Sequence, residues 1–91
     1  MATVTRFYQV YEGYLDDENQ QRESYDSTWL VMDNAIERAD ELASENAYPD
    51  GTVEVETDPD GSMTYFTEAA DAVPKAIALI YVREFSDEAE A

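Results

Sequence analysis

Two apolar runs, one near each end of the chain, limit what this sequence can fold into. The residues from Val4 to Leu15 are rich in aromatic and β-branched side chains, which predicts a long strand. Apolar side chains fall on both of its alternating faces, which indicates an interior strand or one whose second face is also covered. The residues from Ala76 to Phe85 are almost continuously apolar and predict a central, well-buried strand. The second run therefore belongs in the interior of a sheet, and the first either lies there too or has both faces covered.

The segment from Asn34 to about Ala47 has helical periodicity instead. On a helical projection its apolar side chains fall within one arc of about 140°, which is typical of an amphipathic helix. Asp33 is a suitable N-cap, because its carboxylate can accept from the free backbone amides of the first turn. The helix should end near Asn46, since the turn Tyr48–Gly51 contains a proline that cannot continue it.

The segments around this helix predict shorter strands and loops. Asp16–Glu23 is polar and predicts a mobile loop. Ser27–Met32 fits either a second strand or the first turns of the helix, and we favour the strand. After the helix, Thr52–Thr57 alternates valine with polar residues as a half-buried strand does. Ser62–Thr67 should return as its hairpin partner across the turn Asp58–Gly61.

The element order is thus β-β-α-β-β-β. It indicates the α+β class, with a small antiparallel or mixed sheet of roughly four to five strands and one amphipathic helix packed on one face. Residues 1–85 should form a single compact domain, followed by a flexible acidic tail at 86–91. The connection from Glu68 to Pro74 could include one helical turn.

Charge is the other unusual property of the chain. Twenty-two acidic residues face five basic ones and histidine is absent, so the formal net charge at pH 7 is −17. Hydrophobic residues make up 44% of the chain, which is more than a disordered acidic segment carries. Because such a charge repels itself and destabilises the compact state, we expect the folded protein to have a use for it.

Composition also excludes or disfavours several classes of function. Without cysteine the chain has no disulfide and no thiolate site, and without histidine it lacks the usual zinc ligand sets and the Ser-His-Asp triad. The glycines are too far apart for a phosphate-binding loop. With so many acids, a pair of carboxylates says little about general acid–base catalysis. We therefore expect no enzyme activity, no metal and no other cofactor.

The same features bear on where the protein works. No apolar stretch has the length of a membrane span, and Met1–Thr5 lacks the basic and apolar regions of a secretion signal. An acidic surface repels nucleic acid and anionic lipid, so direct contact with either is disfavoured. These features predict a cytoplasmic protein.

Acidic residues of the expected helix fall on the arc opposite its apolar face. Because four residues advance a helix by about 6 Å, they form a row whose spacing is comparable to that of backbone phosphates. Acids at this spacing repel one another, and only Arg38 offers local relief. A merely solvated face and salt adaptation are the alternatives. The candidate partner-binding residues of the helix are Asp33, Glu37, Asp40, Glu41 and Glu45.

The expected hairpin supplies further candidates for the same role. Glu54 and Glu56 share one face of its first strand, and Asp58 and Asp60 lie at its tip. The tip is faintly similar to a calcium loop but lacks the length and terminal glutamate of one, so a plain turn is expected. Candidate aromatic contacts near loops are Tyr14, Tyr25 and Tyr48, although partial burial would also explain them.

In size, acidity, lack of cysteine and histidine, and sheet-plus-helix plan, the chain resembles small phage or mobile-element inhibitors that mimic DNA, such as anti-CRISPR and anti-restriction proteins. The acids of the helix and the hairpin carry this resemblance. It implies a non-enzymatic inhibitor that occupies a basic DNA- or RNA-binding groove of a host defence complex, where lysines and arginines of the partner meet these acids. The alternatives are an acidic salt-adapted domain and a homodimeric interaction module that buries its second apolar sheet face against its own copy.

Overall fold

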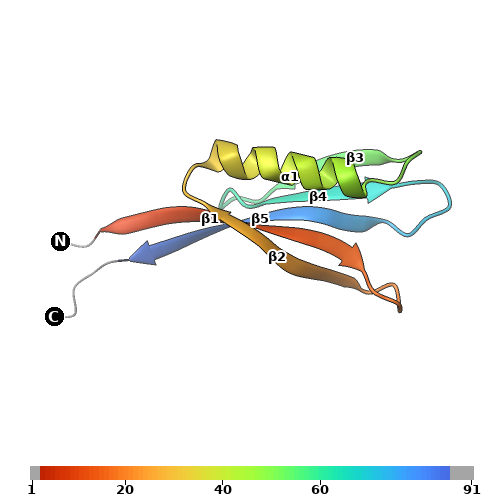
Figure 1. The fold of residues 1–91 in the computed structure, drawn as a ribbon, viewed down its shortest axis with the longest axis horizontal. Coiled ribbons are helices and arrows are strands. Elements are labelled where there is room, and N and C mark those ends of the chain that lie inside the picture. Colours follow the sequence, from red (N-terminus) through yellow and green to blue (C-terminus); the bar gives the residue numbers. More distant parts are fainter. Residues whose placement is uncertain (1–2, 87–91) are drawn as a thin grey trace.

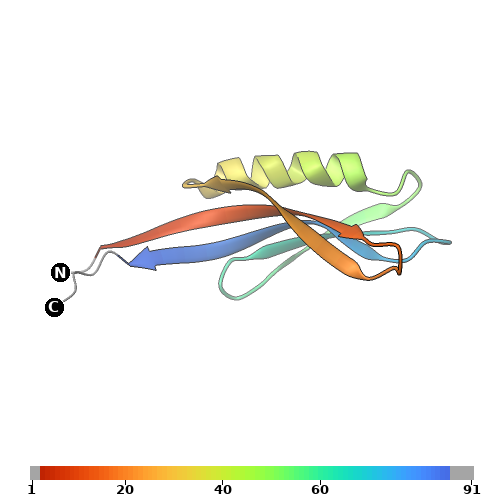
Figure 2. The ribbon, with the colours of Figure 1, turned by 60° about the horizontal axis from the view of Figure 1, so that its bottom comes forward.

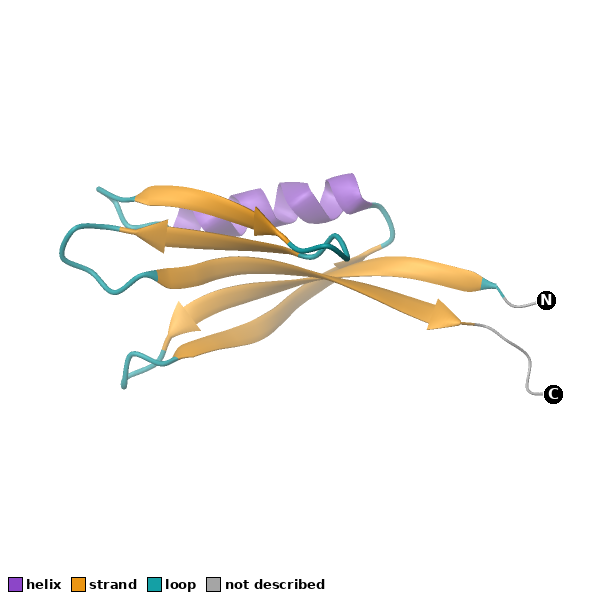
Figure 3. Ribbon diagram, turned by 180° about the vertical axis from the view of Figure 1, so that it is seen from behind, coloured by secondary structure: helices purple, strands orange, loops and turns teal. Residues whose placement is uncertain are grey.

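The computed structural model describes residues 3–86. They form a five-stranded sheet in the order β2-β1-β5-β4-β3, with every neighbouring pair antiparallel, and a helix on one face of it (Figures 1 and 3). The α+β class and the element order are confirmed, and the sheet is antiparallel rather than mixed. The elements are β1 (Val4–Leu15), β2 (Gln21–Trp29), α1 (Met32–Asn46), β3 (Thr52–Thr57), β4 (Met63–Glu68) and β5 (Lys75–Ser86).

The two apolar runs pair with each other inside the sheet. β1 and β5 are antiparallel from Val4 opposite Ser86 to Glu12 opposite Ala78. The bounds of β1 are those predicted, and β5 is one residue longer at each end than predicted. The residues from Val4 to Phe7 pair with β5 alone, so the two strands extend past the helix as a two-stranded ribbon (Figure 2).

The helix buries its apolar arc against the middle of the sheet. α1 lies over β1 and β5, and alanines at successive i, i+4 positions let the helix backbone approach the strands closely. Leu42 is 2% exposed, as expected for a core residue. Ile36, another apolar residue of α1, is only partly buried because it lies at the border of the arc. The buried cluster contains Val10, Ala35, Ala39, Leu42, Ala43, Tyr65, Ile77, Ala78 and Ile80.

The start of the helix differs from the prediction. α1 begins at Met32, and the N-cap position is Val31, which has extended backbone and no side-chain capping bond. The amides of Asn34 and Ala35 donate to the Val31 carbonyl instead. Met32 packs against the core, which explains why an apolar residue begins the helix. Asp33 is therefore not the N-cap but lies in the first turn, where its carboxylate interacts favourably with the helix dipole.

The second strand is longer than predicted. β2 begins at Gln21, so the last part of the predicted mobile loop Asp16–Glu23 is strand. The remainder is a tight turn in which Asp16 Oδ1 accepts from backbone amides. The segment Ser27–Met32 is divided, because β2 ends at Trp29 and the helix begins at its last residue. The sequence did not reveal the beginning of this strand because β2 lies at the edge of the sheet. The polar side chains of an edge strand can remain in solvent, so the strand does not need alternating apolar residues.

A side chain of β2 completes the sheet where the pairing of β1 with β5 stops. The Gln21 amide accepts from the Ala76 backbone N–H at 2.8 Å and donates to the Ala76 carbonyl at 3.0 Å. Gly13 of β1 lies between them, and a Cβ there would be 2.2 Å from the Ala76 carbonyl oxygen. Glycine is required at this position because any side chain would collide with the backbone of β5.

The predicted hairpin is present as β3 and β4. Its turn closes with bonds from the Asp58 amide to the Ser62 carbonyl and from the Gly61 amide to the Asp58 carbonyl, and Gly61 has a φ of 95°. β3 has the predicted bounds, but all of its residues are exposed, so the prediction of a half-buried strand is wrong. β4 is displaced by one residue toward the C-terminus.

The connection after β4 and the C-terminal end of β5 differ from the prediction. The connection after β4 contains a turn at Ala69–Ala72 and no helical turn. Of the predicted tail 86–91, Ser86 is the last residue of β5, and residues 87–91 lie outside the described residues.

Candidate partner-binding surfaces

Acidic side chains occupy the side of α1 that faces away from the sheet. The five candidates of the helix are all exposed, whereas the residues on the opposite side of α1 form its buried surface. We call these five residues the helix row. Its members are Asp33, Glu37, Asp40, Glu41 and Glu45.

Not every member of the helix row is free to meet a partner. Arg38 donates to Glu41 at 3.0 Å, and the Tyr65 hydroxyl donates to Asp40 at 2.9 Å. Burial and this bond raise the pKa of Tyr65 above its usual range. Within the described chain, the other members of the row have neither an ion pair nor a side-chain hydrogen bond. These free acids are Asp33, Glu37 and Glu45.

Arg38 is held mainly by the fold rather than by the helix row. Its Nε and Nη2 atoms each lie 2.8 Å from the Asp26 carboxylate, and both side chains are partly buried. Asp26 is the extra residue of a β-bulge between Tyr25 and Ser27. The hydrogen bond from Arg38 lowers the pKa of Asp26, and the bond to Asp26 raises that of Arg38. Arg38 therefore fixes α1 to β2 and neutralises the row only beside Glu41.

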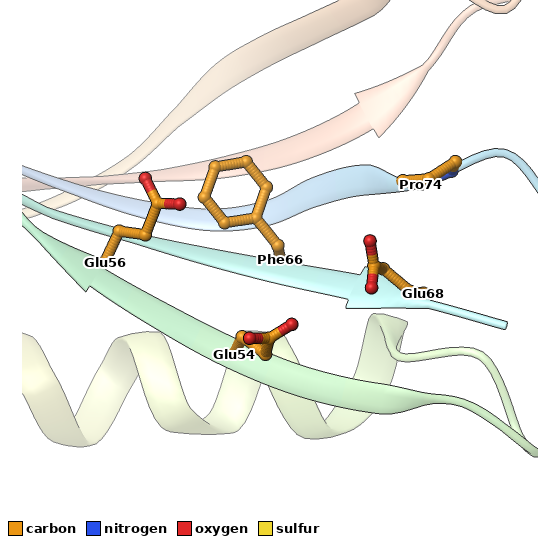
Figure 4. A pocket seen from close by; sticks show the side chains of 5 residues that line it. All are labelled: Glu54, Glu56, Phe66, Glu68 and Pro74. Atoms are coloured by element: carbon orange, nitrogen blue, oxygen red, sulfur yellow. The ribbon is translucent and has the colours of Figure 1, made fainter.

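The strand acids of the hairpin do not join the helix row. Tyr65 reaches α1 from β4, so its neighbours Thr64 and Phe66 point to the other side of the sheet. Glu56 pairs with Thr64 and Glu54 pairs with Phe66, which places both glutamates on that other side (Figure 4). The candidate acids of α1 and those of β3 therefore lie on opposite faces of the sheet.

The acids at the tip of the hairpin belong to its turn. Asp60 Oδ1 accepts from the Ser62 amide at 2.8 Å, and this bond lowers the pKa of Asp60. The Asp58 backbone closes the turn. The segment is thus the hydrogen-bonded turn that was predicted. In the described part of the chain, no group of acidic residues is arranged to hold a metal ion.

The side of the sheet opposite α1, which we call the open face, is not covered by any element of residues 3–86. Its pleat brings together a row of residues from all five strands: Tyr25, Tyr11, Leu79, Thr64 and Glu56. The Tyr11 ring makes edge contacts with Tyr25 at 5.7 Å and with Tyr81 at 5.2 Å between centroids. The centre of the open face is therefore largely aromatic.

Charged groups lie around this aromatic centre. On the β2 side, the Tyr81 hydroxyl donates to both oxygens of Glu23 at 2.7 and 2.9 Å. Burial, together with this bond, raises the pKa of Tyr81 to about 12. The Arg83 guanidinium lies 4.8 Å from the centroid of the Tyr81 ring, which is a cation–π contact.

On the β3 side the open face has a shallow hollow of about 170 Å³ (Figure 4). The Phe66 ring and Pro74 line it, and Glu54, Glu56 and Glu68 surround them. The chain has five basic side chains, all of them within residues 3–86, and none forms an ion pair with these glutamates. The hollow is therefore aromatic at its base and negatively charged at its rim.

The sequence identified parts of the open face without showing that they form one surface. Tyr25, predicted as an aromatic contact, is 56% exposed there. Tyr14 is also exposed, but lies on the helix side of β1. Tyr48 is partly buried, donates its hydroxyl to the Val73 carbonyl and lies under Lys75, so it supports the fold. The one sequence feature that indicated this surface was the presence of apolar side chains on both faces of β1.

Within residues 3–86, no helix combines the length and the hydropathy that crossing a membrane requires. No protein-family model, curated protein or solved structure matches this chain.

Proposed function

We propose that this protein is a non-enzymatic inhibitor that mimics nucleic acid and occupies the basic DNA- or RNA-binding groove of a host defence complex, such as a CRISPR effector or a restriction enzyme. The observation that carries the proposal is the helix row. Its carboxylates are exposed along one rigid element, and Asp33, Glu37 and Glu45 lack a counter-charge in the described chain.

The helix row has the physical properties that such a groove recognises. Successive turns of α1 present carboxylates about every 6 Å, which is comparable to the spacing of phosphates along one strand. The repulsion between them is retained rather than relieved by interleaved lysines, although each like-charge pair costs roughly 0.2–0.5 kcal/mol. A groove lined by lysine and arginine would gain from this arrangement both affinity and a faster, salt-sensitive association.

The test measures DNA cleavage by purified CRISPR effectors and restriction enzymes in the presence of a stoichiometric amount of the protein. For a complex that the wild type inhibits, Glu37→Lys combined with Glu45→Lys should abolish inhibition, because two attractive contacts become repulsive. Both side chains are without partners within residues 3–86, so the change breaks no ion pair of the fold described here.

The matched control is Asp17→Lys combined with Glu18→Lys in the β1–β2 turn. It changes the net charge by the same amount on exposed residues away from α1. Inhibition that survives the control and is lost in the helix variant supports the proposal. If inhibition survives both variants, the helix row is not the site. If the wild type inhibits no complex, the proposed function is wrong.

A further inference from the structure

We propose that the open face is a second, separate docking surface that binds an arginine-bearing segment of a protein partner. In this arrangement one guanidinium stacks on Phe66 in the hollow and is bound by Glu54, Glu56 and Glu68. The inference goes beyond the inhibitor function, since the surface lies on the opposite side of the sheet from the helix row.

The first support is the uncovered aromatic surface itself. Phe66 and Tyr11 are only partly buried, and Tyr25 is 56% exposed. Aromatic side chains with this exposure are the residue type that dominates protein–protein contacts. In a two-layer domain, the second face of an interior strand is normally polar or covered by another element. The second face of β1 is largely apolar and is not covered.

The second support is uncompensated charge at the rim. Arg6, Arg22 and Arg38 are paired with Glu84, Asp16 and Asp26. The remaining basic side chains, Lys75 and Arg83, lie over the rings of Tyr48 and Tyr81. The chain therefore has no basic side chain left for the glutamates of the hollow, and a partner would have to supply it.

The third support is an example of the same contact on the same face. Arg83 already holds its guanidinium over the Tyr81 ring, 4.8 Å from the centroid, and its Nε donates to Gln9 Oε1 at 3.2 Å. Phe66 presents a ring next to carboxylates without such a cation. Arginine suits the site better than lysine, because its planar group can stack on a ring while its N–H groups bond carboxylates in pairs.

Charge complementarity also selects the occupant. A second copy of this chain would bring the same rim of glutamates and the same net charge of −17 to the face. Like charges placed opposite one another in an interface cost several kcal/mol. A basic segment reverses this sign, so we assign the face to a basic partner and not to a homodimer.

The experiment uses fluorescein-labelled peptides with four arginines spaced by Gly-Ser, and the matched lysine peptides, with the full-length protein. Fluorescence anisotropy should show tighter binding of the arginine peptide. Phe66→Leu keeps an apolar side chain but removes the ring, and should reduce that preference by about two- to fivefold. Glu54→Gln combined with Glu56→Gln should weaken arginine binding by about fivefold or more.

The control is Glu37→Gln combined with Glu45→Gln, which removes the same charge from the helix row. It should weaken peptide binding less than the Glu54 and Glu56 pair does. Equal weakening by both pairs, or no preference for arginine over lysine, would show attraction to net charge alone and overturn the proposal. Concentration-dependent dimers in sedimentation equilibrium that block the peptide would also overturn it, in favour of a second copy. Each result is independent of whether the helix row inhibits a defence complex.

Discussion

At the scale of single residues, Arg38 shows how this molecule divides its few positive charges. It binds Asp26 through two short hydrogen bonds and touches only one acid of the helix row. A basic residue within a row of acids would ordinarily be taken as a sign of charge balance on the helix. Its actual partner comes from a bulge in β2, and the sequence contains no signal for that bulge.

Replacing Asp26 tests this pair. Asp26→Asn should lower the free energy of unfolding at pH 7 by about 1–3 kcal/mol, because a charged hydrogen bond between α1 and β2 is weakened. The pKa of Asp26 is lowered in the folded state, so its contribution is present above the ordinary carboxyl pKa and is lost as the pH falls through the folded-state pKa.

Urea unfolding at pH 7, 5 and 3 measures this effect. The difference between wild type and Asp26→Asn should be the same at pH 7 and 5 and should shrink at pH 3 and below. Asp17→Asn, an exposed acid of the β1–β2 turn, should change stability by less than about 0.5 kcal/mol throughout. A difference for Asp26→Asn that is independent of pH would mean that its ionised form is not what stabilises the fold.

Gly13 is a second residue whose role depends on a neighbour that is distant in sequence. Gly13→Ala should destabilise the domain by about 1–3 kcal/mol, because the new methyl group would push β1 away from Ala76 and strain the Gln21 bonds across the gap. Thermal unfolding of this variant is compared with that of Gly61→Asn. The Asn variant should be less destabilised, because Gly61 has a positive φ that asparagine tolerates. An Ala variant at 13 as stable as wild type would contradict the close approach.

At the scale of elements, the prediction was most accurate where the pattern of apolar residues is strong. The bounds of β1 and β3 and the existence of α1 follow from periodicity alone. The start of α1 was displaced because packing of Met32, rather than a capping carboxylate, determines it. The part of β2 before Ser27 was missed because residues such as Gln21, Arg22 and Glu23 gain their strand conformation from pairing with β1.

The packing of α1 gives a prediction at this scale. Leu42→Ala should lower the free energy of unfolding by about 2–5 kcal/mol, because a fully buried side chain leaves a cavity under the helix. Ile36→Ala, at the border of the same arc, should cost less because part of that side chain is already in water. Chemical denaturation of both variants measures the difference, and a larger loss for Ile36 would mean that the helix is rotated from the orientation described.

At the scale of the whole molecule, the sheet separates the two acidic surfaces. The nine candidate acids are all visible in the sequence, but their division depends on strand register: Tyr65 points to α1 and Phe66 points away from it. Periodicity within one strand cannot supply that relation between a helix and a hairpin. In the sequence, the open face was indicated only by the apolar residues on the second face of β1. Its acidic rim could not be recognised there.

The net charge predicts how the whole domain responds to its solution. The melting temperature should rise modestly as salt increases from about 0.05 to 0.5 M, because screening relieves repulsion among the exposed carboxylates. It should also rise between pH 7 and 5, because lowering the pH reduces the net negative charge of the whole domain. The acids whose pKa the fold lowers, Asp16, Asp26 and Asp60, stay ionised over that range and keep their stabilising bonds.

Circular dichroism melts measure this response, with Glu37→Gln combined with Glu45→Gln as the control that should show a weaker salt dependence. A chain that is unfolded at about 0.1 M salt and folds only at molar salt would be a salt-adapted domain. A melting temperature that falls steadily from pH 7 to 5 would mean that the acids are paired within the fold.

The most direct test of nucleic-acid mimicry is competition between this protein and DNA for an inhibited defence complex. The half-inhibitory concentration of the protein is measured at increasing concentrations of the target DNA. If the helix row occupies the DNA-binding groove, that concentration should rise linearly with the concentration of DNA, because the two ligands compete for one site. A half-inhibitory concentration that does not change with DNA would show that the protein binds elsewhere, and would contradict the proposal that its acids stand in for phosphates.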